Sequence, residues 1–314
     1  MKENQTVMKR IVDNMSRVIV GKEGSARLMV IALAASGHVL IEDVPGIGKT
    51  TMANAMAKTV GLSFNRIQFT PDILPSDITG FTVFNQKTGE FEYRSGSIMS
   101  HIILADEINR TSPKTQASML EVMEEKQVTV DGKTYPVPDP FMVIATQNPV
   151  EYMGTYPLPE AQMDRFMMKI AIGYPSKSEE MDILYRFQES SPLSDLDPVV
   201  TREELLDLRQ QVRKVRVDQS LAGYIVDLVT ATRRHEHVML GCSPRASLSL
   251  FRASQAAALY DGRDYVIPED IRDLAVPVLS HRLVLKQEAK IRRITDESII
   301  LDIVNHQKIP VGVK

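Results

Sequence analysis

The sequence lacks the features that mark several classes of protein. Cysteine occurs once among its 314 residues, at Cys242, which excludes an intramolecular disulfide and any metal site built from several cysteines. No uninterrupted apolar run approaches the roughly 18–20 residues that a membrane-spanning helix needs. The polar N-terminal segment also lacks the apolar core of a signal peptide. We therefore expect no membrane insertion and a cytoplasmic location.

An excess of charge of one sign is also absent. The chain has 37 lysines and arginines against 40 aspartates and glutamates, a formal net charge of −3. This balance gives no overall electrostatic reason to expect a nucleic-acid binder or a polybasic membrane binder. Hydrophobic residues make up 43% and charged residues 25%, as in ordinary globular proteins, and the length suits two domains.

The most informative stretch is HVLIEDVPGIGKTT, residues 38–51. A short apolar run leads into a glycine-bearing loop that ends in Gly48-Lys49-Thr50, and an alanine-rich helical pattern follows. The backbone amides of such a loop and the helix dipole favour a bound anion. We expect Lys49 to reach the β- and γ-phosphates of a nucleotide and Thr50 to ligate Mg²⁺. Asp43 stands where the strict motif has glycine, which affects the entry turn of the loop; the alternative is a turn without a ligand.

Two adjacent carboxylates follow a second buried strand, predicted at residues 102–104. Asp106 is predicted to hold Mg²⁺ directly or through water, and Glu107 to polarise the attacking water as a general base. Without a phosphate loop upstream, a solvated loop would be the better interpretation of this pair.

Three further polar residues are candidates with an alternative role each. Asn148, after the next predicted strand, could orient the water or contact the γ-phosphate, or it could be a turn residue before proline. Arg165 and Arg245 could stabilise phosphoryl-transfer charge, including in a neighbouring subunit, or form surface ion pairs.

Strands that alternate with helices predict an α/β domain over residues 1–173, with a parallel sheet and helices on both faces. Residues 70–80 are expected to form a loop, and hairpins are expected at about 81–94 and 127–137. A small all-α domain is predicted over residues 174–314. Its helices are expected at roughly 178–189, 202–214, 218–234, 245–260 and 268–278.

Taken together, these motifs resemble the AAA+ ATPases and, within them, the MoxR family. The resemblance covers almost the whole chain. Its motifs are VGK (20–22), VPGIGKTT (44–51), IQFTPDILPSDITG (67–80), ILADEINR (103–110), ATQNP (145–149), PEAQMDRF (159–166) and GCSPR (241–245). The resemblance implies a P-loop NTPase core followed by a helical lid, ATP and Mg²⁺ as cofactors, and self-association into a homo-hexameric ring.

The resemblance also implies a role for each matching residue. Asn148 matches the residue called sensor 1, and Arg245 matches sensor 2, which would tie the lid to the γ-phosphate in cis or in trans. Arg165 stands where relatives carry the arginine finger that acts on the ATP of the adjacent subunit, and Arg110 is a second candidate. Magnesium would be held by Thr50 and Asp106, with Glu107 and Lys49 catalytic. ATP would be bound by Gly21, Pro45, Gly46, Ile47, Gly48, Lys49, Thr50, Thr51, Asp106 and Arg245.

The implied function is a chaperone-like ATPase whose two hairpins face the pore or rim of the ring. Its partners would be proteins with von Willebrand factor A domains or metal-dependent complexes. An ATPase subunit of a chelatase-like complex is the alternative, because that branch shares the hairpin at 81–94. A nucleic-acid translocase is less favoured, since acidic Glu90, Glu92 and Asp131 accompany the basic residues of the hairpins, which are Lys87, Arg94, Lys126 and Lys133.

Overall fold

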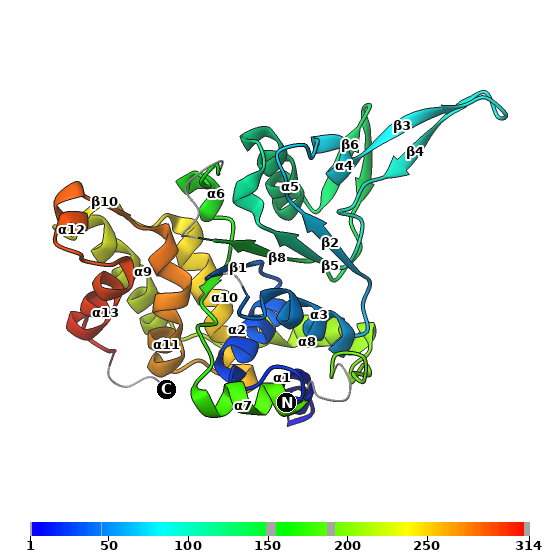
Figure 1. The fold of residues 1–314 in the computed structure, drawn as a ribbon. Coiled ribbons are helices and arrows are strands. Elements are labelled where there is room, and N and C mark those ends of the chain that lie inside the picture. The colour runs from blue at the N-terminus through cyan, green and yellow to red at the C-terminus, as the bar shows by residue number, and fades with distance from the viewer. Residues whose placement is uncertain (1, 45, 149–154, 187–191, 311–314) are drawn as a thin grey trace.

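A computed structural model describes residues 2–44, 46–148, 155–186 and 192–310 (Figure 1). Its centre is a sheet of five strands in which every neighbouring pair is parallel. The strand order is β2 (Phe64–Gln68), β5 (Ile102–Asp106), β8 (Met142–Gln147), β1 (Val39–Glu42) and β9 (Met168–Ile170). The expected parallel sheet is thereby confirmed.

Alternate residues of the strands enter two different hydrophobic cores. Val39 and Ile41 of β1 belong to the larger core, whereas Leu40 between them belongs to the smaller one. This alternation follows from the two-residue repeat of a strand, and each face therefore needs its own helical cover. The expected helices on both faces are present.

Helices from both ends of the sequence cover the first face. The larger core joins α1 (Lys2–Ser16), α2 (Glu23–Ala34) and α3 (Lys49–Thr59) to the helices that follow residue 200. The smaller core lies under α4 (Pro75–Thr79) and α5 (Pro113–Glu125). Two short elements complete this part, the 3₁₀ turn at Ile108–Arg110 and α6 (Glu160–Met163).

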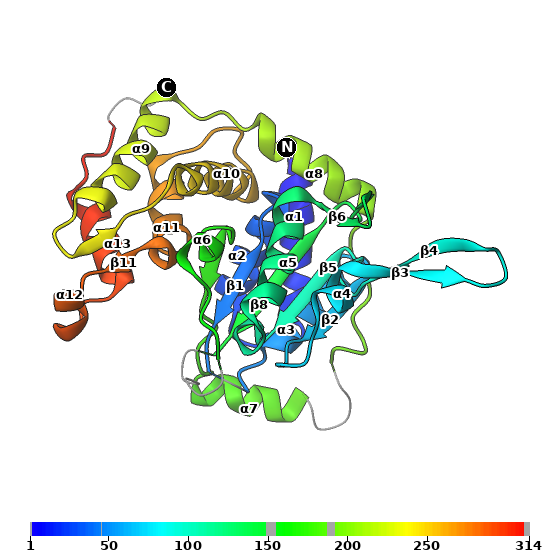
Figure 2. The same cartoon turned by 90° about the horizontal axis from the view of Figure 1, so that it is seen from above.

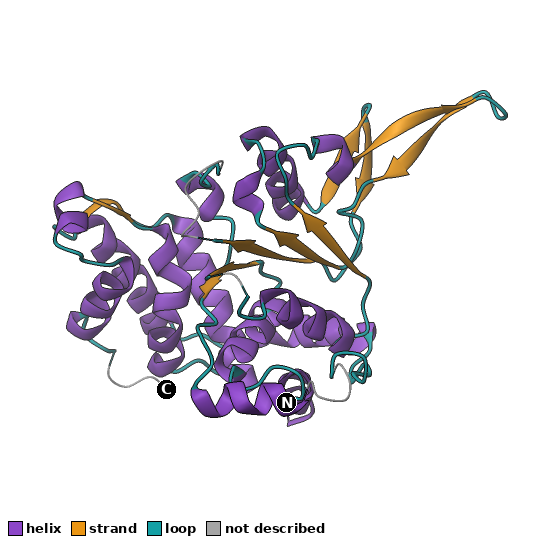
Figure 3. Cartoon of the chain, viewed as in Figure 1, coloured by secondary structure: helices purple, strands orange, loops and turns teal. Residues whose placement is uncertain are grey.

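The C-terminal part is largely helical, and its elements after residue 218 lie together to one side of the sheet (Figure 2, Figure 3). It begins with α7 (Lys177–Arg186), and a two-stranded antiparallel ladder of β10 (Val238–Leu240) and β11 (Val284–Leu285) interrupts it. Its other elements are α8 (Arg202–Lys214), α9 (Gln219–Arg234), α10 (Pro244–Tyr260), α11 (Pro268–Leu279), the 3₁₀ turn Ser280–Arg282, α12 (Gln287–Ile291) and α13 (Asp296–His306). Within the described residues, no helix has both the length and the apolar character that a membrane crossing requires.

Two hairpins leave the α/β part where the sequence predicts them. β3 (Gly80–Asn85) pairs with β4 (Glu90–Ser95), and β6 (Gln127–Val130) pairs with β7 (Lys133–Pro136). The first hairpin projects far from the rest of the molecule (Figure 1). Tyr93 and Tyr135 stack with ring centroids 3.9 Å apart, so the bases of the two hairpins are in contact.

Some expectations about local structure were wrong. Residues 70–80 are not all loop, because Pro75–Thr79 form α4, which begins with proline in its first turn. The amide of Leu74 there donates to the Asp77 carboxylate at 2.9 Å. The short β9 and the last two helices were not expected, because segments of three to eleven residues give only a weak periodic signal.

A buried histidine joins the sheet to α5. His38 precedes β1, and its Nδ1 accepts a hydrogen bond from the Val143 amide at 2.9 Å. Its Nε2 lies 3.1 Å from the Met123 carbonyl oxygen, to which it therefore donates as a neutral imidazole. Burial lowers the pKa of His38 to about 4. Protonation would place a hydrogen on Nδ1, which could then no longer accept the hydrogen bond from the Val143 amide.

We expect His38 to make the protein sensitive to acid. The unfolded chain binds a proton at His38 below about pH 6.5, whereas the folded chain does so only near pH 4, so stability falls as the pH drops through this window. Between pH 7 and pH 5, wild type should lose about 2 kcal/mol more free energy of unfolding than His38→Gln. Urea unfolding at both pH values measures this. His306→Gln, at an exposed position, should behave like wild type, and equal losses in all three proteins would contradict the prediction.

Candidate active site

The predicted nucleotide-binding residues meet at one edge of the sheet. Lys49 is the first residue of α3, which follows β1. Asp106 is the last residue of β5, Glu107 comes next, and Asn148 follows β8. Because these strands are parallel and adjacent in the order β5-β8-β1, their carboxyl ends lie side by side. Such an edge is the usual place for a ligand in an open α/β sheet.

The loop between β1 and α3 has the backbone of a phosphate-binding loop. Gly46 and Gly48 have φ angles of 84° and 90°, in the region that favours glycine. A Cβ atom at either position would meet no atom within 4 Å, so the conformation rather than crowding calls for glycine. Lys49 Nζ donates to the carbonyl oxygen of Asp43 at 2.6 Å. Pro45, expected to contact the nucleotide, lies outside the described residues.

Oxygen donors that suit Mg²⁺ converge beside this loop. The Thr50 hydroxyl lies 3.5 Å from Asp106 Oδ2, and Thr146 donates to Asp106 Oδ1 at 2.6 Å. Hydroxyl and carboxylate oxygens are ligands that Mg²⁺ accepts, so these residues fit the ion. Arg66 on β2 contacts Asp106 Oδ2 through Nε at 3.1 Å and Nη2 at 2.6 Å. The guanidinium therefore balances the charge of the buried carboxylate.

Glu107 is held in an unusual backbone conformation beside Asp106. Its φ of 57° lies in the left-handed region, which non-glycine residues seldom adopt outside turns and functional sites. Its amide donates to the Thr146 hydroxyl at 2.9 Å. Its carboxylate accepts a hydrogen bond from Gln68 at 2.9 Å and pairs with Arg110 at 3.2 Å. The orientation of Glu107 is thus set by groups on three different segments.

An apolar cavity of about 180 Å³ adjoins the phosphate loop. Its lining residues are Val18, Ile19, Val20, Lys22, Gly46, Ile47, Gly48, Thr51, Met52, Ile172, Pro175 and Ile183. Gly21 packs against α7: a Cβ atom there would come within 1.7 Å of Glu179 Oε1. Its neighbours Val20 and Lys22 line the cavity, and contact of Gly21 with the adenine stays a prediction. Apolar walls beside a phosphate site suit a planar base.

The Asp43 carboxylate accepts three backbone hydrogen bonds that the sequence does not predict. Its Oδ1 accepts from the Val44 amide at 2.8 Å, and its Oδ2 accepts from the amides of Ile172 and Gly173 at 2.8 and 2.6 Å. The residue that replaces the usual glycine therefore ties the phosphate loop to the segment that leaves β9 toward α7.

The two predicted charge-stabilising arginines lie at the opposite edge of the sheet. Arg165 comes just before β9, whose first residue pairs with Val39 at the start of β1. Its Nη1 donates to the Leu120 carbonyl at 2.6 Å and lies 3.2 Å from Glu124 Oε2. Arg245, in the first turn of α10, contacts the other oxygen of Glu124. Because four-residue β1 spans roughly 10 Å, these arginines are separated by the sheet from the phosphate loop of their own chain.

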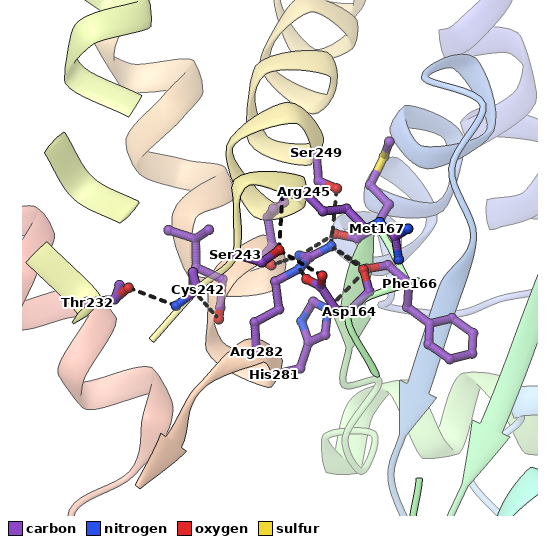
Figure 4. Close-up of polar contacts among 12 residues, drawn as sticks. Asp164, Phe166, Met167, Thr232, Cys242, Ser243, Arg245, Ser249, His281 and Arg282 are labelled. Carbon is purple, nitrogen blue, oxygen red and sulfur yellow. Dashed lines mark hydrogen bonds and ion pairs between the residues drawn. The ribbon is translucent and has the colours of Figure 1, made fainter. Parts of the chain in front are cut away.

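Asp164, which precedes Arg165 in the chain, contacts residues near the start of α10 and in the last 3₁₀ turn (Figure 4). Its Oδ1 accepts from Nε of the buried Arg282 at 2.8 Å, and its Oδ2 accepts from the hydroxyl of Ser243 at 2.8 Å. Ser243 is also the N-cap of α10. Arg282 further donates to the Phe166 carbonyl at 2.6 Å. The segment that carries Arg165 and the helix that carries Arg245 are therefore joined through one carboxylate.

Comparison with known sequences also indicates an ATPase of the AAA type. A family model described as "ATPase family associated with various cellular activities (AAA)" matches residues 38–168, and one described as "AAA lid domain" matches residues 230–303. The chain is 42% identical to Chaperone MoxR1 of Mycobacterium tuberculosis over 312 residues, which cover 96% of this chain and 82% of that relative. The chain belongs to the MoxR family of AAA+ ATPases.

Two further relatives and a solved structure are similar over most of the chain. The chain is 55% identical to the uncharacterized protein YeaC of Bacillus subtilis, over 96% of this chain and 94% of that protein. It is 30% identical to Protein MoxR of Paracoccus denitrificans, over 88% of each chain. A crystal structure of a candidate ATPase from Cytophaga hutchinsonii, 41% identical, superposes with a TM-score of 0.91 and covers 98% of both chains. Membership of an ATPase family implies that the protein binds a nucleotide.

The sequence motifs do not identify several residues that contact the predicted site residues. Arg66 and Gln68 lie on β2, which the sequence predicts as a strand without showing that its polar side chains face the end of β5. Thr146 lies in an apolar strand, and Glu124 lies on an amphipathic helix among three other glutamates or lysines. Only the sheet order and the pairing of side chains across elements single them out.

We expect Asp43 to stabilise the fold at this edge. Asp43→Ala leaves the amides of Val44, Ile172 and Gly173 without their acceptor, so the free energy of unfolding should fall by about 1–3 kcal/mol. Asp72→Ala, at an exposed position, should change it by no more than about 0.5 kcal/mol. Denaturant titrations of the three proteins decide this. Equal stability of wild type and Asp43→Ala would show that water replaces these bonds without loss.

Proposed function

We propose that the protein hydrolyses ATP to ADP and phosphate in a Mg²⁺-dependent reaction, at sites that a neighbouring subunit completes. One observation carries this proposal: the hydrolytic residues and the two arginines of one chain lie at opposite edges of the same sheet. An arginine at the far edge acts on a phosphate only if the phosphate belongs to another chain. A closed ring of identical subunits, such as the homo-hexamer that the family resemblance implies, would give every site such a neighbour.

Each residue at the carboxyl edge has a task in this reaction. The amides of the loop and of α3 bind the phosphates, and Lys49 exchanges the Asp43 carbonyl for the β- and γ-phosphates. Thr50 and Asp106 would hold Mg²⁺, which would neutralise charge on the phosphates. Glu107 takes a proton from the attacking water, and Asn148 orients that water. The base occupies the apolar cavity beside the loop.

A partner's Arg165 and Arg245 would stabilise the charge that develops on the transferred phosphoryl group. Arg110 is less suited to this role, since it lies beside Glu107, at the same edge of the sheet as the phosphate loop of its own chain. This assignment makes Arg165 the finger and lets Arg245 act in trans.

The energy of hydrolysis is proposed to remodel or mature other proteins. Phe81, Phe84 and Phe91 of the projecting hairpin are 50%, 51% and 70% exposed, and exposed aromatic side chains are common in partner-binding surfaces. The name of the mycobacterial relative, a chaperone, agrees with this role. Proteins with von Willebrand factor A domains are the partners that the family resemblance implies. Residues 174–314, the helical lid, would move with the bound nucleotide.

Two substitutions should separate ATP binding from hydrolysis. Glu107→Gln removes the general base and should lower kcat about 10²- to 10⁴-fold, with the Kd for ATP nearly unchanged. Arg165→Ala should lower kcat about 10³-fold or more, also without loss of ATP binding. Phosphate release and titration with a fluorescent ATP analogue measure the two quantities.

The control for Arg165→Ala is Arg216→Ala, whose side chain is 72% exposed, and this variant should hydrolyse ATP like wild type. Full activity of Glu107→Gln would overturn the assignment of the base. Loss of ATP binding in Arg165→Ala would show that this arginine supports the fold rather than the reaction.

A further inference from the structure

One carboxylate lies between the two arginines that are proposed to act in trans. Glu124 Oε2 is 3.2 Å from Arg165 Nη1, and Glu124 Oε1 contacts Arg245 Nη2. The three side chains come from α5, from the segment before β9 and from α10. Segments about 120 residues apart in the chain thus converge on a single side chain.

The contact brings two positive charges together that would otherwise repel each other. A carboxylate has acceptor sites for two guanidinium groups, one on each oxygen, and so compensates the repulsion between them. The side chains of Arg165, Arg245 and Glu124 are 29%, 41% and 37% exposed. Arginine ends that remain partly exposed stay accessible to a second molecule.

The bases of the two arginines are fixed independently of Glu124. Asp164, next to Arg165, binds the Ser243 hydroxyl at the start of the helix that carries Arg245. The Arg165 guanidinium also donates to the Leu120 carbonyl, one turn before Glu124 on α5. With the backbones fixed in this way, the Glu124 carboxylate contacts both guanidinium groups and joins them to each other.

We propose that Glu124 is a positioning residue that holds Arg165 and Arg245 together as one unit, which a subunit presents to the nucleotide of its neighbour. This inference rests on the proposed function. It also makes a separate prediction about Glu124. The subunit that donates the arginines needs Glu124, whereas the subunit that holds the ATP does not.

Mixed assemblies test this requirement. Arg165→Ala subunits keep the phosphate loop, and Lys49→Ala subunits keep the arginines, so each is inactive alone and their mixture should regain ATPase activity. Glu124→Gln is then added to one or the other variant. In the Lys49→Ala subunit it should lower the regained kcat about tenfold, because misplaced catalytic groups lose their effect steeply with distance. In the Arg165→Ala subunit it should change nothing.

Two further variants test whether Glu124→Gln acts only by disturbing the structure. Glu124→Asp keeps the carboxylate and should restore part of the loss when it is in the Lys49→Ala subunit. Glu125→Gln, at the adjacent exposed position, should leave the regained activity unchanged in either subunit. The ATP Kd of each mixture should match that of the parent mixture, because Glu124 does not touch the phosphate loop.

The outcomes are distinct. If the parent mixture regains no activity, the trans site of the proposed function is wrong. If it regains activity and Glu124→Gln acts equally from both subunits, or from neither, the positioning role is overturned. A rise in activity when Glu124→Gln is in the arginine donor would also overturn it, because Glu124 would then compete with the phosphate for the arginines.

Discussion

The parallel arrangement of the central sheet is the constraint on which the rest of the structure depends. When all strands run the same way, their carboxyl ends form one edge and their amino ends the other. Lys49, Asp106, Glu107 and Asn148 follow strand ends and so gather at the first edge. Arg165 precedes a strand and so lies at the second. Under the proposed function, these two groups of residues are the halves of a hydrolytic site, and assembly would join them.

Two aspartates connect these halves to the C-terminal helices. Asp43 links the phosphate loop to Ile172 and Gly173, where the chain leaves β9 for α7. Asp164 links the Arg165 segment to Arg282 and Ser243. Both contacts lie at places where the α/β part meets the helices that follow.

Much of this arrangement could be predicted from the sequence, because the signals are local. A glycine-bearing loop before Lys49, carboxylates after a β-branched run and Asp131-Gly132 in a hairpin each specify their own backbone. The contributions of Gln68, Glu124 and Asp43 could not be predicted. Each depends on which segment lies beside it, and that follows from strand order and helix packing rather than from any short motif.

In the proposed function, one chain alone lacks a complete hydrolytic site. The most direct test measures ATPase activity per chain from nanomolar to micromolar protein, with light scattering to record the mass at each concentration. We expect activity per chain to rise together with the fraction of chains in the assembly and to be lost where monomers dominate. Constant activity per chain across a range in which the protein is monomeric would contradict it.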